Sequence, residues 1–96
     1  MTAFWSALAT GQGALAAQGA ALAAGDREGL WATTAALHDA VAALASAWPT
    51  VATDREAQAA LAAFHRSLQR HYRLLAARAA WQTALVSRIA PNATVW

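Results

Sequence analysis

The sequence predicts an all-α protein, a three-helix antiparallel bundle or hairpin with a long C-terminal helix. Thirty-one of the 96 residues are alanine and eleven are leucine, against two prolines and five glycines. Alanine and leucine are the best helix formers, so local propensity favours helix almost throughout. We expect a single helical domain, residues 1–96, because a chain of this length has no room for two hydrophobic cores.

Leucine spacing divides the chain into three helices. Leucines recur every seven residues in three runs, which are Leu8, Leu15 and Leu22, then Leu30, Leu37 and Leu44, then Leu61, Leu68 and Leu75. A spacing of seven keeps side chains on one face of a helix. We therefore predict helices over about residues 3–24, 27–47 and 54–90. At 1.5 Å per residue the third helix would be about 55 Å long and the others about 30 Å, so a compact bundle would cover only part of it.

Turn residues mark the first junction. Gly25 suits a left-handed C-cap and Asp26 suits the N-cap of the next helix. We expect a tight turn or a sharp kink there. Whether the first two helices form a hairpin or one bent rod stays open at this stage.

The later helix ends have their own signals. The Trp48-Pro49 pair ends the second helix by steric conflict. Thr53 and Glu56 have the capping-box spacing of a hydroxyl and a glutamate three residues later. The third helix is expected to end at Pro91.

Helical periodicity also predicts the core. The large residues expected inside are Phe4, Leu8, Leu15 and Leu22; Leu30, Leu37, Val41, Leu44 and Trp48; and Leu61, Phe64, Leu68, Tyr72, Leu75, Ala79, Val86 and Ile89. Gly11 and Gly19 would allow a neighbouring helix to approach closely. Trp5 and Trp31 lie off the leucine faces and are expected at the edge of the core, and the terminal Val95 and Trp96 are expected to pack back onto the bundle.

Charge is distributed unevenly along the chain. Through Glu56 there are five acids and two arginines, a net charge of −3, whereas from Ala57 onward there are five arginines and no acid, a net charge of +5. The simpler interpretation is a basic last helix with its arginines in solvent; the sharper one is an acidic partner surface. Nucleic-acid binding is unlikely, because the arginines Arg66, Arg70, Arg73 and Arg88 have no aromatic residues interleaved on their own face.

The residue content argues against an enzyme and against bound cofactors. Cysteine is absent, which removes thiolate catalysis and cysteine-ligated metal sites. None of the histidines His38, His65 and His71 has a histidine or carboxylate three or four residues away, as a helical metal site requires. The first 25 residues carry no charged side chain, but their glycines, glutamines and hydroxyl residues argue against a membrane span or signal peptide. We expect a soluble, cytoplasmic, non-enzymatic protein without cofactor or metal.

One feature of the third helix is unusual. Leu74, Trp81 and Leu85, with Arg78 between them, follow the spacing i, i+7, i+11 and form a second apolar stripe away from the leucine face. We call these three residues the second stripe. A helix that is apolar on two sides needs two neighbours. The first two helices could each cover one stripe. Alternatively, the second stripe is exposed and binds an amphipathic helix of another protein, or it is the contact surface of a homodimer.

Three segments resemble the small flagellar (type III) export chaperones of the FliT and FlgN kind. They are the aromatic-led start Phe4-Trp5 with Leu8, the junction LAAGDREGL at 22–30, and the final HYRLLAARAAWQTALVSRI at 71–89. The resemblance implies a long last helix in which partner contacts concentrate. In the FliT kind a further C-terminal helix folds over the binding face; this sequence stops at Trp96, so the resemblance implies an open face.

These observations lead to two hypotheses of function. The first is a cytoplasmic chaperone or adaptor that binds an amphipathic helical segment of a flagellar or type III export substrate. Its expected contact residues are Arg70, Arg73, Leu74, Arg78, Trp81 and Leu85. The alternative is a self-associating structural bundle, a homo-oligomer with no separate substrate.

Overall fold

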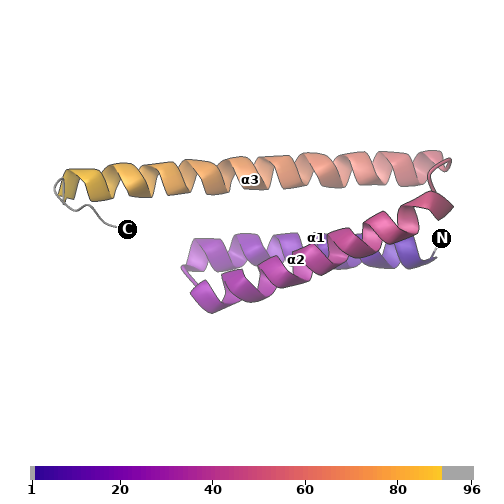
Figure 1. Cartoon of the computed structure of the whole chain (residues 1–96), viewed down its shortest axis with the longest axis horizontal. Coiled ribbons are helices and arrows are strands. Elements are labelled where there is room, and N and C mark those ends of the chain that lie inside the picture. The colour runs from indigo at the N-terminus through magenta and orange to yellow at the C-terminus, as the bar shows by residue number, and fades with distance from the viewer. Residues whose placement is uncertain (1, 90–96) are drawn as a thin grey trace.

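The computed structural model describes residues 2–89, without the side chains of Gln82, Val86 and Ile89, and this part of the chain is helical apart from two short connections. Its elements are α1 (Thr2–Ala24), α2 (Arg27–Ala47), a short 3-10 helix η1 (Trp48–Thr50) and α3 (Arg55–Ile89). Figure 1 shows α1 and α2 as a hairpin with α3 running alongside it. The prediction of an all-α chain with three α-helices is confirmed, and the first two helices form a hairpin rather than a bent rod.

The turn between α1 and α2 forms as its residues predict. Gly25 has a φ of 67°, in the left-handed region that glycine adopts without strain. Its N–H donates to the Leu22 carbonyl, and the N–H of Asp26 donates to the Ala21 carbonyl, which is the Schellman pattern. Asp26 then caps α2, because its carboxylate accepts from the Gly29 N–H at 3.0 Å.

The connection between α2 and α3 differs in one detail from the prediction. α2 ends at Ala47, directly before Trp48-Pro49, as expected. The residue that caps α3, however, is Asp54 and not Thr53: its carboxylate accepts from the Glu56 N–H at 2.9 Å. The capping-box prediction is therefore wrong by one residue, and the physical reason is that aspartate, present at the adjacent position, is a better N-cap than threonine.

The hydrophobic core lies where all three helices meet. Phe4, Leu8, Leu37, Leu44 and Phe64 are buried as predicted, and small alanines fill the space between them. The partly buried predicted residues are Leu15, Leu22, Leu30, Trp48, Leu61, Leu68 and Leu75, together with Trp5 at the core edge. Burying a large apolar side chain stabilises the fold by about 1.5–3 kcal/mol, so these few anchors supply much of the stability.

Three of the predicted inward residues, and one predicted at the core edge, face solvent instead. The side chains of Val41 and Tyr72 are 43% and 55% exposed, and Ala79 is also exposed. Trp31, expected at the core edge, is 74% exposed. Val41 and Tyr72 stay partly uncovered because α2 and α3, which carry them, pack only slightly against each other. Ala79 is exposed because it follows Arg78, near whose level α1 ends.

Some sequence predictions fall outside the described part of the chain. Val86 and Ile89 were predicted for the core, but their side chains are not described. Pro91, as the end of α3, and the packing of Val95 and Trp96 lie outside the described residues.

A glycine lets α3 approach the hairpin closely. A Cβ added to Gly11 would lie 3.0 Å from the Phe64 ring and 3.5 Å from the Ala40 methyl. Gly11 therefore contacts both α2 and α3, as predicted. The same expectation for Gly19 is wrong, because no neighbouring side chain lies within 4 Å of the position its Cβ would take.

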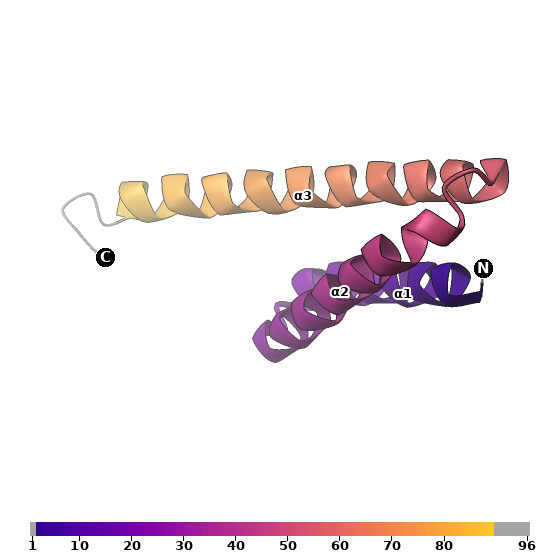
Figure 2. The same cartoon turned by 45° about the vertical axis from the view of Figure 1, so that its right-hand side comes forward.

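α3 runs parallel to α1 and continues past it. Gln18 bonds to His71, and further along both helices Leu22 bonds to Arg78, so residue numbers rise together on α1 and α3. α1 ends at Ala24, soon after the level of Arg78, whereas α3 continues to Ile89. Residues 79–89, about 16 Å of helix, extend beyond the hairpin, as Figures 1 and 2 show.

Candidate partner-binding surface

The second stripe is exposed in the structure. The side chain of Leu74 is 65% exposed, that of Trp81 is 64% exposed and that of Leu85 is 39% exposed. All three project from α3, at the spacing that puts them on one side of a helix. The helices of the described chain therefore leave this stripe uncovered, and the hairpin does not consume both apolar sides of α3.

The end of α1 explains why the later part of the stripe, Trp81 and Leu85, is open. The guanidinium of Arg78 donates to the Leu22 carbonyl at 3.0 Å, close to the last turn of α1. A cation at this position complements the partial negative charge of a helix C-terminus. Trp81 and Leu85 follow Arg78 on α3, beyond the point where α1 can reach them.

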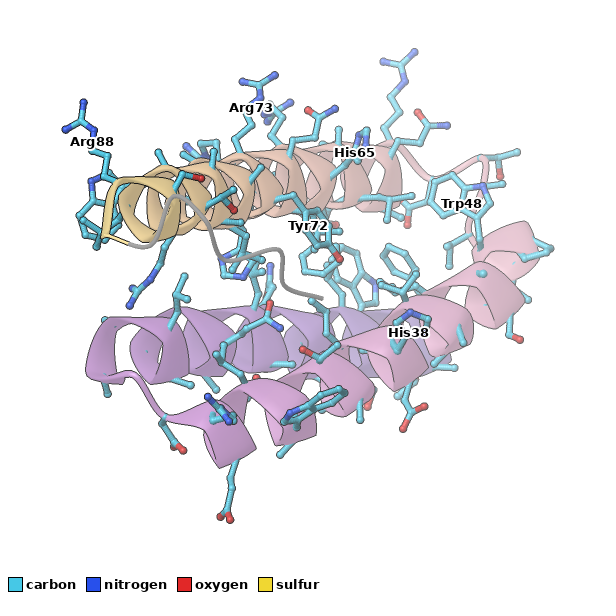
Figure 3. The ribbon with its side chains drawn as sticks, turned by 60° about the vertical axis from the view of Figure 1, so that its left-hand side comes forward. His38, Trp48, His65, Tyr72, Arg73 and Arg88 are labelled. Atoms are coloured by element: carbon cyan, nitrogen blue, oxygen red, sulfur yellow. The ribbon has the colours of Figure 1, made fainter. Side chains whose placement is uncertain are left out.

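Arginines border the second stripe. Arg70 and Arg73 are exposed, and the Arg70 guanidinium contacts only its own helix, donating to the Ser67 hydroxyl at 3.3 Å. Figure 3 shows Arg73 and Arg88 projecting from the side of α3 that faces away from the hairpin. Arg78 is also exposed overall, but its bond to α1 gives it a structural role that the sequence did not indicate.

A series of side-chain hydrogen bonds, centred on the buried Gln18 and His71, joins the three helices. Gln18, 5% exposed, donates from Nε2 to the Thr34 hydroxyl at 2.6 Å, and Thr34 donates to the Leu30 carbonyl. Gln18 Oε1 lies 2.6 Å from His71 Nε2. Because an amide oxygen only accepts, the hydrogen in this bond must be on His71 Nε2. These hydrogen bonds fix the position of α3 along the hairpin.

Sequence reasoning missed these hydrogen bonds, although a signal was present. Gln18 lies seven residues after the buried Gly11, and His71 lies seven residues after the buried Phe64. Each is thus a polar residue at a core position of its helix. Buried polar groups are hydrogen-bonded almost without exception, so two such positions on different helices are candidates to bond to each other.

A separate hollow lies between α2 and α3. Its volume is about 620 Å³, and its walls are mainly apolar and carry no formal charge. It is lined by Val41, Leu44, Ala45, Trp48, Gln58, Leu61, Ala62, Phe64, His65 and Leu68. We call this the α2–α3 groove. At about 100° per residue, Leu74 and Trp81 lie on roughly the opposite side of α3 from Leu61, so the groove and the second stripe are distinct surfaces.

The second stripe is composed of apolar side chains bordered by arginines. Within residues 2–89, no three histidine, aspartate or glutamate side chains gather closely enough to hold a metal ion. None of the described helices combines the length and apolar character needed to cross a membrane. The second stripe provides exposed apolar area beside exposed arginine side chains, a combination typical of protein contacts.

Comparison with known proteins gives no match. No protein-family model matches the chain, and no curated protein and no solved structure matches it either.

Proposed function

We propose that this protein is a non-enzymatic adaptor or chaperone that holds an amphipathic helical segment of another protein against the second stripe. The observation that carries the proposal is the exposure of Leu74, Trp81 and Leu85 on a helix that runs past its own hairpin. Exposed large apolar residues in a row are uncommon on a protein with no partner. Amphipathic helices bind to such rows through residues one or two turns apart.

The three residues of the second stripe differ in what they would contribute. Trp81 lies between the other two and combines a large apolar ring with a hydrogen-bond donor, and tryptophan is enriched among residues that dominate binding energy. Leu74 lies near the end of α1, so a bound helix would contact both α3 and the last turn of α1. The resemblance to flagellar export chaperones supports an export substrate as the source of the helix.

The test uses a synthetic amphipathic helix with leucines at positions i, i+4, i+7 and i+11, titrated into the protein by calorimetry. Trp81→Ala should weaken binding by at least about 2 kcal/mol, which is roughly thirtyfold in Kd, with the circular dichroism spectrum unchanged. Trp31→Ala is the matched control, because Trp31 is equally exposed but lies on α2. It should leave Kd unchanged.

Two results would contradict the proposal. The first is equal loss of binding in Trp31→Ala and Trp81→Ala. The second is loss of binding in Val41→Ser with none in Trp81→Ala, which would place the peptide in the α2–α3 groove. A homo-oligomer in sedimentation that Trp81→Ala converts to monomer would favour the self-associating alternative.

A further inference from the structure

Positive charge gathers along one edge of the second stripe. At about 100° per residue, Arg70 and Arg88 both lie within roughly 20° of Trp81 around α3. Arg66 and Arg73 lie farther round in the same direction. All four are exposed, and no acidic residue follows Glu56 anywhere in the sequence.

The other edge of the second stripe is different. There α3 lies against α1, and residues 2–24 contain no charged side chain. The single cation on this edge, Arg78, donates to the Leu22 carbonyl of α1. The second stripe therefore has one strongly basic edge and one edge that is uncharged except for an arginine already bonded to the hairpin.

The basic edge carries repulsion that the chain itself does not relieve. Arg66 and Arg70 are four residues apart and Arg70 and Arg73 are three apart, the spacings at which like charges on a helix destabilise each other. Acidic side chains at the same spacings would have offset this repulsion, and α3 has none after Glu56. Carboxylates supplied by a bound molecule would do so instead.

We propose that the helix held on the second stripe is acidic, with carboxylates along the edge of its apolar face that meets Arg70 and Arg88. This inference rests on the proposed function and names the chemical class of its partner. Charge complementarity of this kind fixes the orientation of a partner and raises its association rate more than it raises affinity.

A second copy of the chain fits this edge poorly. Its own α3 would bring its five arginines after Glu56 toward the same five of the first copy. Its acids are partly committed, since Asp26 and Asp54 cap helices. Glu56 lies in the first turn of α3, far along the helix from Trp81. Glu28 and Asp39 share one side of α2, where Ala32 and Ala35 lie between them; the nearest large apolar residue, Trp31, lies about 60° round the helix from Glu28.

The test compares three synthetic helices with the same leucine face and with Glu, Gln or Lys at the flanking positions. In about 20 mM salt the Glu peptide should bind about fivefold to tenfold more tightly than the Gln peptide, as expected for two exposed ion pairs. The difference should largely disappear in about 0.5 M salt, where screening is strong. The Lys peptide should bind more weakly than the Gln peptide.

Paired variants locate the effect. Arg70→Gln with Arg88→Gln should reduce binding of the Glu peptide to the level of the Gln peptide and leave the Gln peptide unchanged. Arg27→Gln with Arg55→Gln removes the same amount of charge from exposed residues elsewhere and is the control. It should preserve most of the preference for the Glu peptide.

The outcomes separate this inference from the proposed function. If the Glu and Gln peptides bind equally and Trp81→Ala weakens both, the partner is not selected for acidity and helix capture stands. A Lys peptide that binds best would also overturn the inference. If no peptide binds, or if sedimentation shows a dimer that Trp81→Ala dissociates, the proposed function fails and the acidic partner fails with it.

Discussion

The two halves of α3 both carry large apolar residues but have different surroundings. In the first half Ala57 is fully buried and Phe64 is 3% exposed, because both face the hairpin. In the second half Leu74 and Trp81 are about two-thirds exposed: Leu74 lies on the side of α3 away from Leu61, and Trp81 also follows Arg78, near whose level α1 ends. The difference shows that an apolar side chain on α3 is buried only where it both faces the hairpin and lies within the length of α1.

Replacing Phe64 should have the largest effect on stability. Phe64→Ala removes a ring packed against Gly11 and the hairpin core, and we expect the free energy of unfolding to fall by about 3–5 kcal/mol. Urea unfolding followed by circular dichroism measures this loss. A loss below about 1 kcal/mol would mean that the first half of α3 is no better packed than the second.

A larger side chain at position 11 should push α3 away from the hairpin. Gly11→Leu places a large side chain where a Cβ alone would already lie 3.0 Å from Phe64, and overpacking of this kind costs about 1–3 kcal/mol. Gly13→Leu is the control, because nothing lies within 4 Å of the position of its Cβ. There the gain in helix propensity should raise stability slightly, and equal effects of both substitutions would contradict the close approach of α3.

Gln18 and His71 should behave as a coupled unit. Gln18→Leu leaves His71 without its partner, so we expect a loss of about 1–3 kcal/mol in the free energy of unfolding. Adding His71→Leu should recover part of that loss, because both polar groups are then removed together. Purely additive losses in the double-mutant cycle would show that Gln18 and His71 do not interact.

The cap of α2 should contribute least among these sites. Asp26→Ala removes the side chain that accepts from the Gly29 N–H, and the expected cost is about 1 kcal/mol. Asp39→Ala, at an exposed position inside α2, should change stability by less than about 0.5 kcal/mol. Thermal unfolding of the two variants side by side would show the difference.

The sequence predicts local features of this fold better than long-range ones. Leucine spacing, Gly25, Asp26 and Pro49 predict the helix bounds to within one residue at each described end, because these signals act within one or two turns. Which helices cover which residues depends on how α2 and α3 diverge around α1. That arrangement exposes Val41 and Tyr72, and the spacing of residues within a single helix does not predict it.

The candidate surface was predicted in part for the same reason. The spacing of Leu74, Trp81 and Leu85 indicates a second apolar side of α3, but three neighbours were possible for it: the hairpin, a second copy or another protein. The exposure of all three residues rules out cover by the described hairpin. The bond between Arg78 and Leu22 depends on where α1 ends relative to α3, which the sequence of α3 alone does not contain.

The central claim is that the second stripe lies outside the protein's own core. The most direct test is the free energy of urea unfolding of the triple variant Leu74→Gln, Trp81→Gln, Leu85→Gln, in which glutamine keeps helix propensity high. We predict a change of less than about 1 kcal/mol, because none of the three side chains is buried in the core. A loss of about 3 kcal/mol or more would show that the stripe is buried in the free protein and would contradict the claim.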